Sequence, residues 1–136
     1  MVIQEEVLTL ASDFDVIEIP YDEWRATQLA QQLAAQGANP IQYPHTVKAL
    51  SPPMKELEAA IKAKRFHHDG NPVFKWMASN VVAKADNNNN LFPNKEKPEM
   101  KIDGIVALLM GIGRAIVLNE DTTVNKAYEN HGIRFL

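Results

Sequence analysis

The hydrophobic and polar positions of the first part of the chain follow two different periods. Residues 2–10 and 24–34 carry apolar side chains at helical spacing, which predicts two short amphipathic helices. Between them, the compact apolar run at residues 14–19 stops at a proline and favours a buried strand. Residues 40–43 follow as a second short strand. This order has the βαβ rhythm of an α/β sheet.

The middle of the chain is predicted to start with a loop at residues 45–50. Ser51 is a suitable N-cap with a proline directly after it, and the apolar spacing then predicts a helix reaching about Phe66. Another short helix begins at Asn71 with a proline at its first position. We expect Trp76 to anchor this helix in the core.

The last third of the chain is dominated by one apolar segment. Residues 80–85 predict a strand, and residues 91–100 predict a loop rich in proline and lysine. Residues 102–118 have almost no polar face and predict a buried helix, with Arg114 in its last turns. The segment after that helix is polar until the apolar end at 132–136, which is expected to dock back onto the body.

Size and charge limit the classes of function. A chain of 136 residues with 46% hydrophobic residues is sufficient for one core and short for two domains. The formal charge of −3 and the pI near 5.8 argue against a general electrostatic grip on nucleic acid. Any contact with DNA is therefore expected to be local, or to come from another part of a larger protein.

Several kinds of site are excluded by missing motifs. The chain has no cysteine, so it has neither disulfides nor a thiolate metal site. It shows no signal peptide, no apolar run long enough for a membrane span, no phosphate loop of an ATP motor and no GxSxG serine elbow. We therefore expect a cytoplasmic protein in which acidic side chains are the best candidates for chemistry.

Two aspartates occupy positions where a carboxylate is useful. Asp103 opens the apolar helix, and Asp22 follows the predicted first strand, at the edge where α/β sheets gather functional groups. Each has two interpretations: a helix N-cap, or a ligand for Mg²⁺ or Mn²⁺. His68 lies in the sequence His-His-Asp, where adjacent side chains rarely point at one ion, so a loop role is favoured. Lys95 and Lys101 lie close to Asp103 in sequence and can meet a phosphate, with solvation as the alternative.

Four stretches in order resemble the carboxy-terminal part of the large subunits of tailed-phage terminases. They are FDVIEIPYDEWRATQLAQQLAAQG, SPPMKELEAAIKAKRFHHDGNPVFKWMASNVVAKAD, KPEMKIDGIVALLMGIGRAI and AYENHGIRFL. The phrases DGNPVFKWMASNVV and KIDGIVALLMGIGRA are the most specific. The resemblance covers nearly the whole chain.

The resemblance implies an α/β nuclease domain of the ribonuclease H-like fold, which cuts concatemeric DNA during packaging into capsids. In that family three acidic positions bind two divalent ions, Mg²⁺ or Mn²⁺. Asp22 matches the middle position and Asp103 the last. The first acid lies in the family on an earlier strand, so we expect this sequence to be truncated on its amino-terminal side, without the first strands and without the ATPase domain.

The resemblance also implies partners and supporting residues. Double-stranded DNA is the expected substrate, with the portal protein and the small terminase subunit as further partners. His68, Asn80, Lys95 and Lys101 are assigned to DNA contacts or to groups that support the metal ligands. With two of three acids, the chain alone is expected to be weakly active or inactive. The alternatives are a noncatalytic interaction module left from a prophage and another ribonuclease H-like nuclease, such as a resolvase or transposase.

Overall fold

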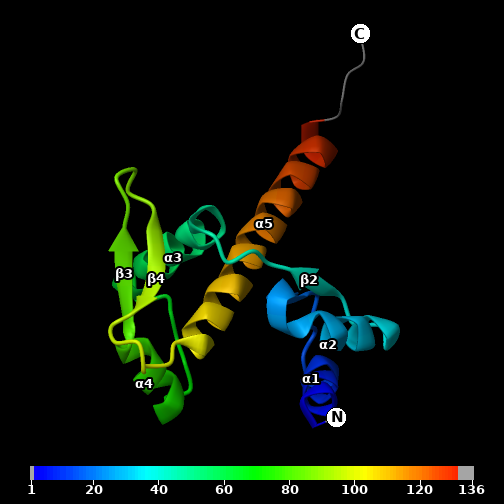
Figure 1. Ribbon diagram of the computed structural model, residues 1–136. Coiled ribbons are helices and arrows are strands. Elements are labelled where there is room, and N and C mark those ends of the chain that lie inside the picture. The colour runs from blue at the N-terminus through cyan, green and yellow to red at the C-terminus, as the bar shows by residue number, and fades with distance from the viewer. Residues whose placement is uncertain (1, 132–136) are drawn as a thin grey trace.

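A computed structural model describes residues 2–131, with side chains described throughout that range except at positions 124, 125 and 127–131. The elements in chain order are α1 (Val2–Asp13), β1 (Ile19–Tyr21), α2 (Glu23–Ala35), β2 (Pro40–Gln42), α3 (Val47–Lys62), α4 (Pro72–Ser79), β3 (Val81–Ala85), β4 (Leu91–Lys95) and α5 (Asp103–His131). Figure 1 shows the long α5 between two groups of elements. Residues 2–42 form the amino-terminal region on one side. Residues 47–95 form the hairpin region on the other.

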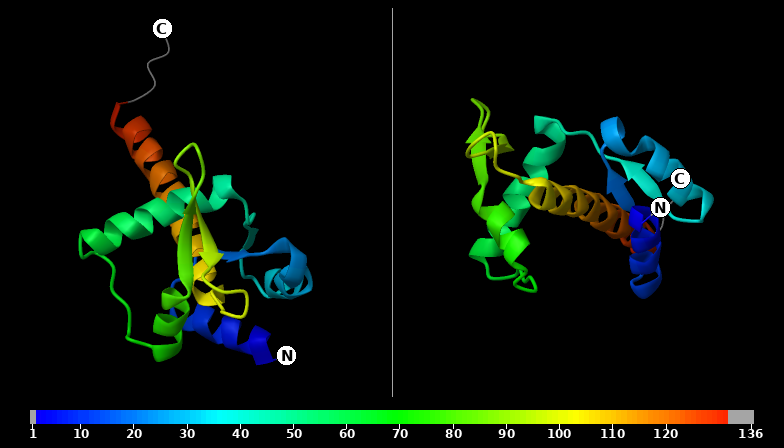
Figure 2. Two further views of the ribbon diagram at one scale, coloured as in Figure 1. Left: turned by 60° about the vertical axis from the view of Figure 1, so that its left-hand side comes forward. Right: turned by 60° about the horizontal axis from the view of Figure 1, so that its bottom comes forward.

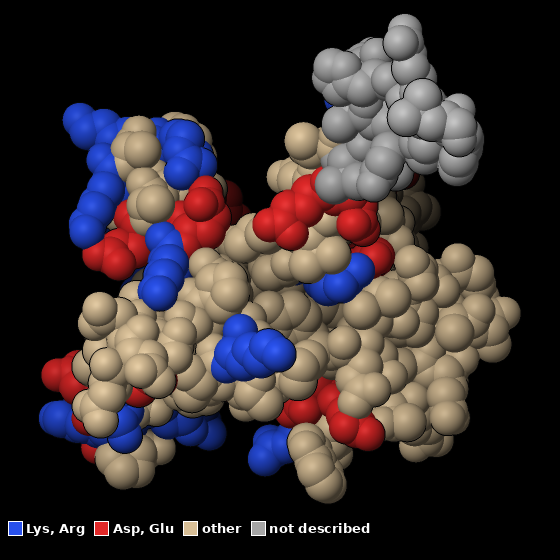
Figure 3. Space-filling model, turned by 90° about the horizontal axis from the view of Figure 1, so that it is seen from above, with Lys and Arg blue, Asp and Glu red and all other residues tan. Residues whose placement is uncertain are grey.

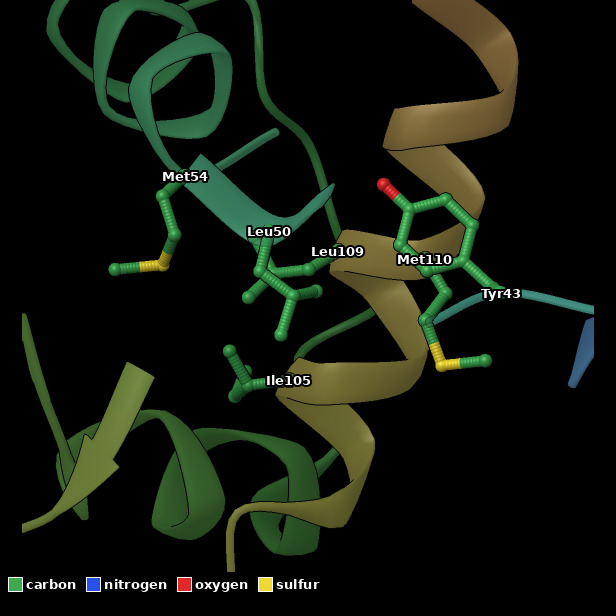
Figure 4. Packing of buried hydrophobic residues seen from close by; sticks show 6 residues of the cluster. All are labelled: Tyr43, Leu50, Met54, Ile105, Leu109 and Met110. Carbon is green, nitrogen blue, oxygen red and sulfur yellow. The ribbon is translucent and has the colours of Figure 1, made fainter. Parts of the chain in front are cut away.

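The hydrophobic core lies between α5 and the hairpin region. Its buried side chains come mainly from α3 and α5, and they are Tyr43, Leu50, Met54, Ile105, Leu109 and Met110 (Figure 4). Leu109 is completely buried. Partly buried side chains of α4, β3 and β4 pack around this cluster. The apolar face of α5 therefore organises the packing of the hairpin region, and the views in Figure 2 agree with this central position of the helix.

The amino-terminal region is a small parallel βαβ unit, as its hydrophobic pattern predicts. β1 pairs with β2 in parallel, with Ile19 opposite Pro40 and Tyr21 opposite Gln42. α2 joins the two strands and begins at its N-cap Asp22. The predicted helix at residues 2–10 is also confirmed as α1.

A partly buried ion pair attaches this region to α5. The guanidinium of Arg114 donates to both carboxylate oxygens of Glu18, from Nε at 2.6 Å and from a terminal nitrogen at 2.9 Å. Only 10% of the Glu18 side chain is exposed. The hydrogen bond from Arg114 lowers the pKa of Glu18, and its attraction outweighs the opposing effect of burial. The sequence pattern predicted Arg114 in the last turns of its helix. Because α5 continues to His131, Arg114 lies near the middle of the helix instead.

The prediction of a loop at residues 45–50 was wrong, because α3 begins at Val47. Thr46 is the N-cap and accepts a hydrogen bond from the backbone N–H of Ala49 at 3.2 Å. Pro53 lies inside the helix and lacks the N–H that would normally bind the carbonyl of Ala49. The hydroxyl of Tyr43 donates to that carbonyl instead, at 2.6 Å. A contact from another part of the chain therefore allows the proline inside this helix.

The prediction of a loop over all of residues 91–100 was also wrong. Residues 91–95 form β4, which pairs with β3 in an antiparallel hairpin from Val81 opposite Lys95 to Ala85 opposite Leu91. The backbone N–H of Leu91 donates to Ser51 Oγ at 3.0 Å, so Ser51 supports the hairpin and does not cap a helix. Pairing with β3 and packing against α3 decide this segment, and neither is visible in its local pattern.

Three further expectations differ from the structure. The run at residues 14–19 is not a buried strand, since Phe14 is 67% exposed and only Ile19 belongs to β1. Trp76 is 47% exposed and does not anchor the core. α5 continues to His131, well beyond the predicted end of the apolar segment. The predicted docking of residues 132–136 onto the body lies outside the described residues.

Among the described helices, none has both the length and the apolar content needed to cross a bilayer.

Candidate active site

Asp22 lies at the carboxyl end of β1 and has one carboxylate oxygen available. Its Oδ1 accepts a weak hydrogen bond from the backbone N–H of Trp24 at 3.3 Å, which makes it the N-cap of α2. Its Oδ2 faces His45, whose Nδ1 lies 3.8 Å away. The N-cap interpretation of Asp22 is therefore confirmed. A capping role leaves the second oxygen free for another partner.

His45 was not identified from the sequence, although its position carries a signal. It lies three residues after the end of β2, and Asp22 lies directly after the end of β1. Because the carboxyl ends of parallel strands meet at one edge of a sheet, the two side chains come together there. The other ring nitrogen, Nε2, lies 3.3 Å from the sulfur of Met110 on α5. His45 therefore bridges the sheet edge and α5.

Asp103 is the first residue of α5, and its side chain is exposed. Met110 follows it by seven residues, which corresponds to almost two full turns, so the two side chains leave the helix in nearly the same direction. The distance between them along the axis is about 10 Å. His45 contacts Met110, and Asp22 faces the other nitrogen of the same ring, so both acids approach α5 from one side.

The donor atoms of this site are oxygens of two carboxylates and one imidazole nitrogen. Oxygen donors suit Mg²⁺, and the mixed set also suits Mn²⁺. Within the part of the chain that the structure describes, no three side chains of His, Asp or Glu gather closely enough to hold an ion. Carboxylate oxygens and imidazole nitrogen are suitable donor types for such ions, but a two-ion site needs more carboxylates than the described residues bring together.

Asn80 has a structural place close to the start of α5. It is buried, and its side-chain amide donates to the carbonyl of Lys101 at 2.9 Å. Its own backbone carbonyl accepts from Glu96, at the end of the hairpin. In this position Asn80 holds the segment that leads into Asp103. Lys95 and Lys101 are exposed around the same point, which is compatible with the phosphate contacts predicted for them.

The structure does not bring His68 to the two aspartates. Its Nδ1 accepts from the backbone N–H of Gly70, and its ring lies 5.7 Å from that of Phe74. Together with Leu108 of α5, these residues line an apolar pocket. Leu108 and Met110 are two positions apart and leave α5 on nearly opposite sides. His68 and His45 therefore lie across the helix from each other.

The surface charges do not form a broad DNA-binding face in the view of Figure 3. Basic and acidic side chains alternate on this face of the described residues. Two cations at the end of α3 and just after it are paired, Lys62 with Glu58 and Arg65 with Glu56. The mixed charges agree with the low pI. They are consistent with the expectation that any contact with DNA is local.

Comparison with known proteins identifies relatives over most of the chain. The family model described as terminase large subunit, endonuclease domain, matches residues 2–119. Protein YmfN of Escherichia coli (strain K12) is 46% identical over 123 residues, which are 89% of this chain and 27% of that protein. The terminase large subunit of Enterobacteria phage HK97 is 29% identical over 112 residues, which are 81% of this chain and 22% of the relative.

A solved structure shows the same arrangement of helices and strands. The crystal structure of the HK97 bacteriophage large terminase matches with a TM-score of 0.73 and 27% identity, over 83% of this chain and 24% of that one. The chain thus spans about a quarter of the length of these relatives. The match confirms the ribonuclease H-like α/β fold that the sequence resemblance implied. The chain belongs to the family of terminase large subunit endonuclease domains.

Proposed function

We propose that this chain carries part of the active site of a metal-dependent endonuclease that cuts concatemeric DNA during phage genome packaging. Asp22 and Asp103 are the metal ligands in this proposal. The observation that supports it best is the position of both carboxylates on one side of α5, each at the end of a structural element that fixes its backbone. Packaging takes place in the host cytoplasm, where we place the protein.

Each acid has a defined task in this proposal. Bound Mg²⁺ or Mn²⁺ ions activate a water molecule and offset the charge on the leaving oxygen of a phosphodiester. Asp22 directs Oδ2 to the site, because Oδ1 is held by the backbone N–H of Trp24. Asp103 presents its carboxylate from the first turn of α5, and Asn80 fixes the segment before it through the carbonyl of Lys101. Exposed Lys95 and Lys101 contact phosphates of double-stranded DNA next to these acids.

The remaining carboxylates come, in this proposal, from protein outside the described residues. β1 pairs with β2 along one edge, and no strand among the described residues pairs with its other edge. A strand added to that edge would run beside Asp22 and bring an acid to the site. The partial domain alone is then weakly active or inactive, and the portal protein and small terminase subunit are its partners during packaging.

Plasmid nicking tests this function. The chain is incubated with supercoiled plasmid and Mn²⁺, and wild type is compared with Asp22→Asn, Asp103→Asn and an EDTA control. We expect slow nicking by wild type that both variants and EDTA reduce to background. Asp121→Asn is the matched control, since this exposed acid lies about five turns further along α5. Equal nicking by wild type and the Asp103→Asn variant removes Asp103 from the mechanism.

A noncatalytic interaction module is the second candidate, and two observations favour it. The apolar side chains of Phe14, Val16 and Ile17 are exposed beside β1, and the outer edge of β1 is unpaired within the described residues. Both features are typical of a surface that binds another chain. This candidate predicts that Mg²⁺ and Mn²⁺ show no binding that depends on Asp22 and Asp103, which titration calorimetry measures directly.

A further inference from the structure

We propose that α1 of one copy of this chain docks into a groove between α3 and α4 of a second copy. The inference concerns self-association and goes beyond the proposed function, because it uses neither the two aspartates nor a metal ion. It starts from two surfaces that are uncovered within the described residues. They are an apolar stripe on α1 and an apolar groove in the hairpin region.

One side of α1 carries exposed apolar side chains, and no side chain of this helix is buried. Ile3 and Leu10 are seven positions apart, which is almost two helical turns. Phe14 follows one turn later, since its backbone N–H still donates to the carbonyl of Leu10 at 3.0 Å. All three side chains are exposed. They form one stripe with the spacing of an amphipathic helix that docks into a groove.

The complementary surface lies between the end of α3 and α4. Two adjoining hollows of about 440 and 290 Å³ form one continuous cleft there, which we call the α3–α4 groove. The walls of both hollows share Ile61, Phe66, Phe74 and Ala78. Leu10 and Phe14 of the stripe are about 6 Å apart along the helix axis, a spacing that suits two adjoining hollows.

The two surfaces carry opposite charges. No lysine or arginine precedes Arg25 in the chain, and Glu6 and Asp13 flank the stripe on α1. The rim of the groove carries Lys64 and Lys75, and neither has an ion-pair partner among the described residues. A helix with acidic flanks is therefore attracted to this rim, and the charges select it over a neutral or basic helix.

The helix cannot reach the groove of its own chain. Figure 1 shows α1 in the amino-terminal region, with α3 and α4 across α5 from it. Only residues 14–18 link α1 to β1, and Glu18 at the end of this link is held to α5 by Arg114. Each copy therefore presents a helix and a groove that fit another copy. Because a helix of 12 residues buries a small area, the association is weak and depends on concentration.

Sedimentation equilibrium of the full chain tests the proposal. We expect the mass of one chain, 15.2 kDa, at about 5 µM and a rise towards two or more chains at about 500 µM. Raising the NaCl concentration from about 50 mM to about 500 mM should weaken the association, because salt screens the exposed charges. Wild type that stays monomeric over the whole range overturns the proposal and leaves the groove to a different protein.

Two variants each damage one half of the contact. Leu10→Glu changes the stripe and Ile61→Glu changes the groove. Both side chains are exposed, so each variant should fold, and its dissociation constant should rise at least about tenfold. Val82→Glu is the matched control, because Val82 is 46% exposed, like Leu10, and does not line the groove. This control should associate like wild type.

A mixture of the two variants makes the test specific for this pair of surfaces. Leu10→Glu keeps its groove and Ile61→Glu keeps its helix, so an equimolar mixture should form dimers with one copy of each. Growth should stop at two chains, since the dimer then offers only the two damaged surfaces. If circular dichroism shows that a variant has lost its helices, Leu10→Ser or Ile61→Ser takes its place.

The outcomes are independent of those for the proposed function. Association of either variant alone at the strength of wild type overturns the proposal, and so does a mixture that associates no more strongly than its components. Loss of plasmid nicking in Asp22→Asn bears on the metal site alone, so each hypothesis can fail without the other.

Discussion

The amino-terminal region and the hairpin region pack against the same helix in very different ways. The hairpin region and α5 share a continuous core in which Leu50 and Leu109 are almost completely buried. In the amino-terminal region the buried apolar side chains are Ala30 and Leu33, while Phe14 and its neighbours are exposed. Burial of apolar surface is the main source of stability, so the two regions should differ in stability and rigidity.

This difference matters because the candidate ligands are divided between the regions. Asp103 begins the well-packed helix, whereas Asp22 belongs to the loosely packed sheet. Contacts of residues on either side of the sheet with α5 join this region to the helix, and we use the name junction for the following set. They are the ion pair of Glu18 with Arg114, the packing of Tyr43 against Gly113, and the contact of His45 with Met110. The junction therefore sets the relative position of the two acids.

The largest expected effect comes from a cavity in the core. Leu109→Ala should lower the free energy of unfolding by about 4 kcal/mol, because the tightly packed core around this side chain cannot collapse into the cavity. Leu33→Ala should cost less, about 2 kcal/mol, although Leu33 is nearly as buried, because its loosely packed neighbours can move in. Urea denaturation measures both values. Equal losses would show that the two regions are packed equally well.

The next effect tests the junction through two glycines of α5. A Cβ at position 113 would overlap the buried ring of Tyr43, with 2.7 Å to its Cζ atom, and that ring is held by its hydrogen bond to Ala49. Gly113→Ala should therefore destabilise the protein by about 2 kcal/mol. Gly111→Ala meets nothing within 4 Å and should stabilise the helix by up to about 1 kcal/mol. Thermal unfolding of both variants checks the prediction, and two shifts of the same sign would contradict it.

The ion pair of the junction should give an effect of similar size, but one that depends on pH. Glu18→Gln should cost about 2 kcal/mol at pH 7, because Arg114 then lacks its charged partner in a mostly buried place. The pKa of Glu18 is lowered in the folded state, so its contribution is complete above the ordinary pKa and is lost as the pH falls through the lowered value. The difference between wild type and variant should therefore shrink in strong acid.

Urea midpoints at about pH 7 and about pH 3 measure this dependence. The matched control is Glu58→Gln. Lys62 also lowers the pKa of Glu58, but this pair lies on the exposed face of α3. Its removal should leave the urea midpoint nearly unchanged at both values of pH. A loss at Glu58 as large as that at Glu18 would mean that burial does not determine the strength of these pairs.

Local patterns were sufficient for the helices that bury one face, and for the order of strand, helix and strand around Asp22. They failed where a distant contact decides the structure. The early start of α3 depends on Tyr43 and the freed carbonyl of Ala49, and β4 depends on its pairing with β3. The hydrophobic run at residues 14–19 was misassigned because apolar composition alone does not show which side chains find a partner.

The residues of the candidate site also divide into those with a local sequence signal and those that depend on distant contacts. Asp22 and Asp103 could be chosen as candidates from the sequence, since each lies at the end of a predicted element and within a motif that resembles the family. His45 and Glu18 were not, because their partners on α5 are 65 and 96 positions away in the chain. Asn80 was predicted to contact DNA or to support the metal ligands, and its burial and its hydrogen bond to the carbonyl of Lys101 are visible only in three dimensions.

The smallest expected effect separates the two roles of Asp22. Asp22→Asn keeps a side-chain oxygen for the backbone N–H of Trp24, so the capping of α2 should survive and stability should change by less than about 0.5 kcal/mol. Asp22→Ala removes that acceptor and should cost about 1 kcal/mol. Urea denaturation distinguishes these values. Both variants lack the carboxylate and should lose Mn²⁺ binding to the same extent, which titration calorimetry measures. Retained binding in the Asn variant alone would mean that the cap, by holding the sheet edge in place, matters more for the ion than the charge of the side chain.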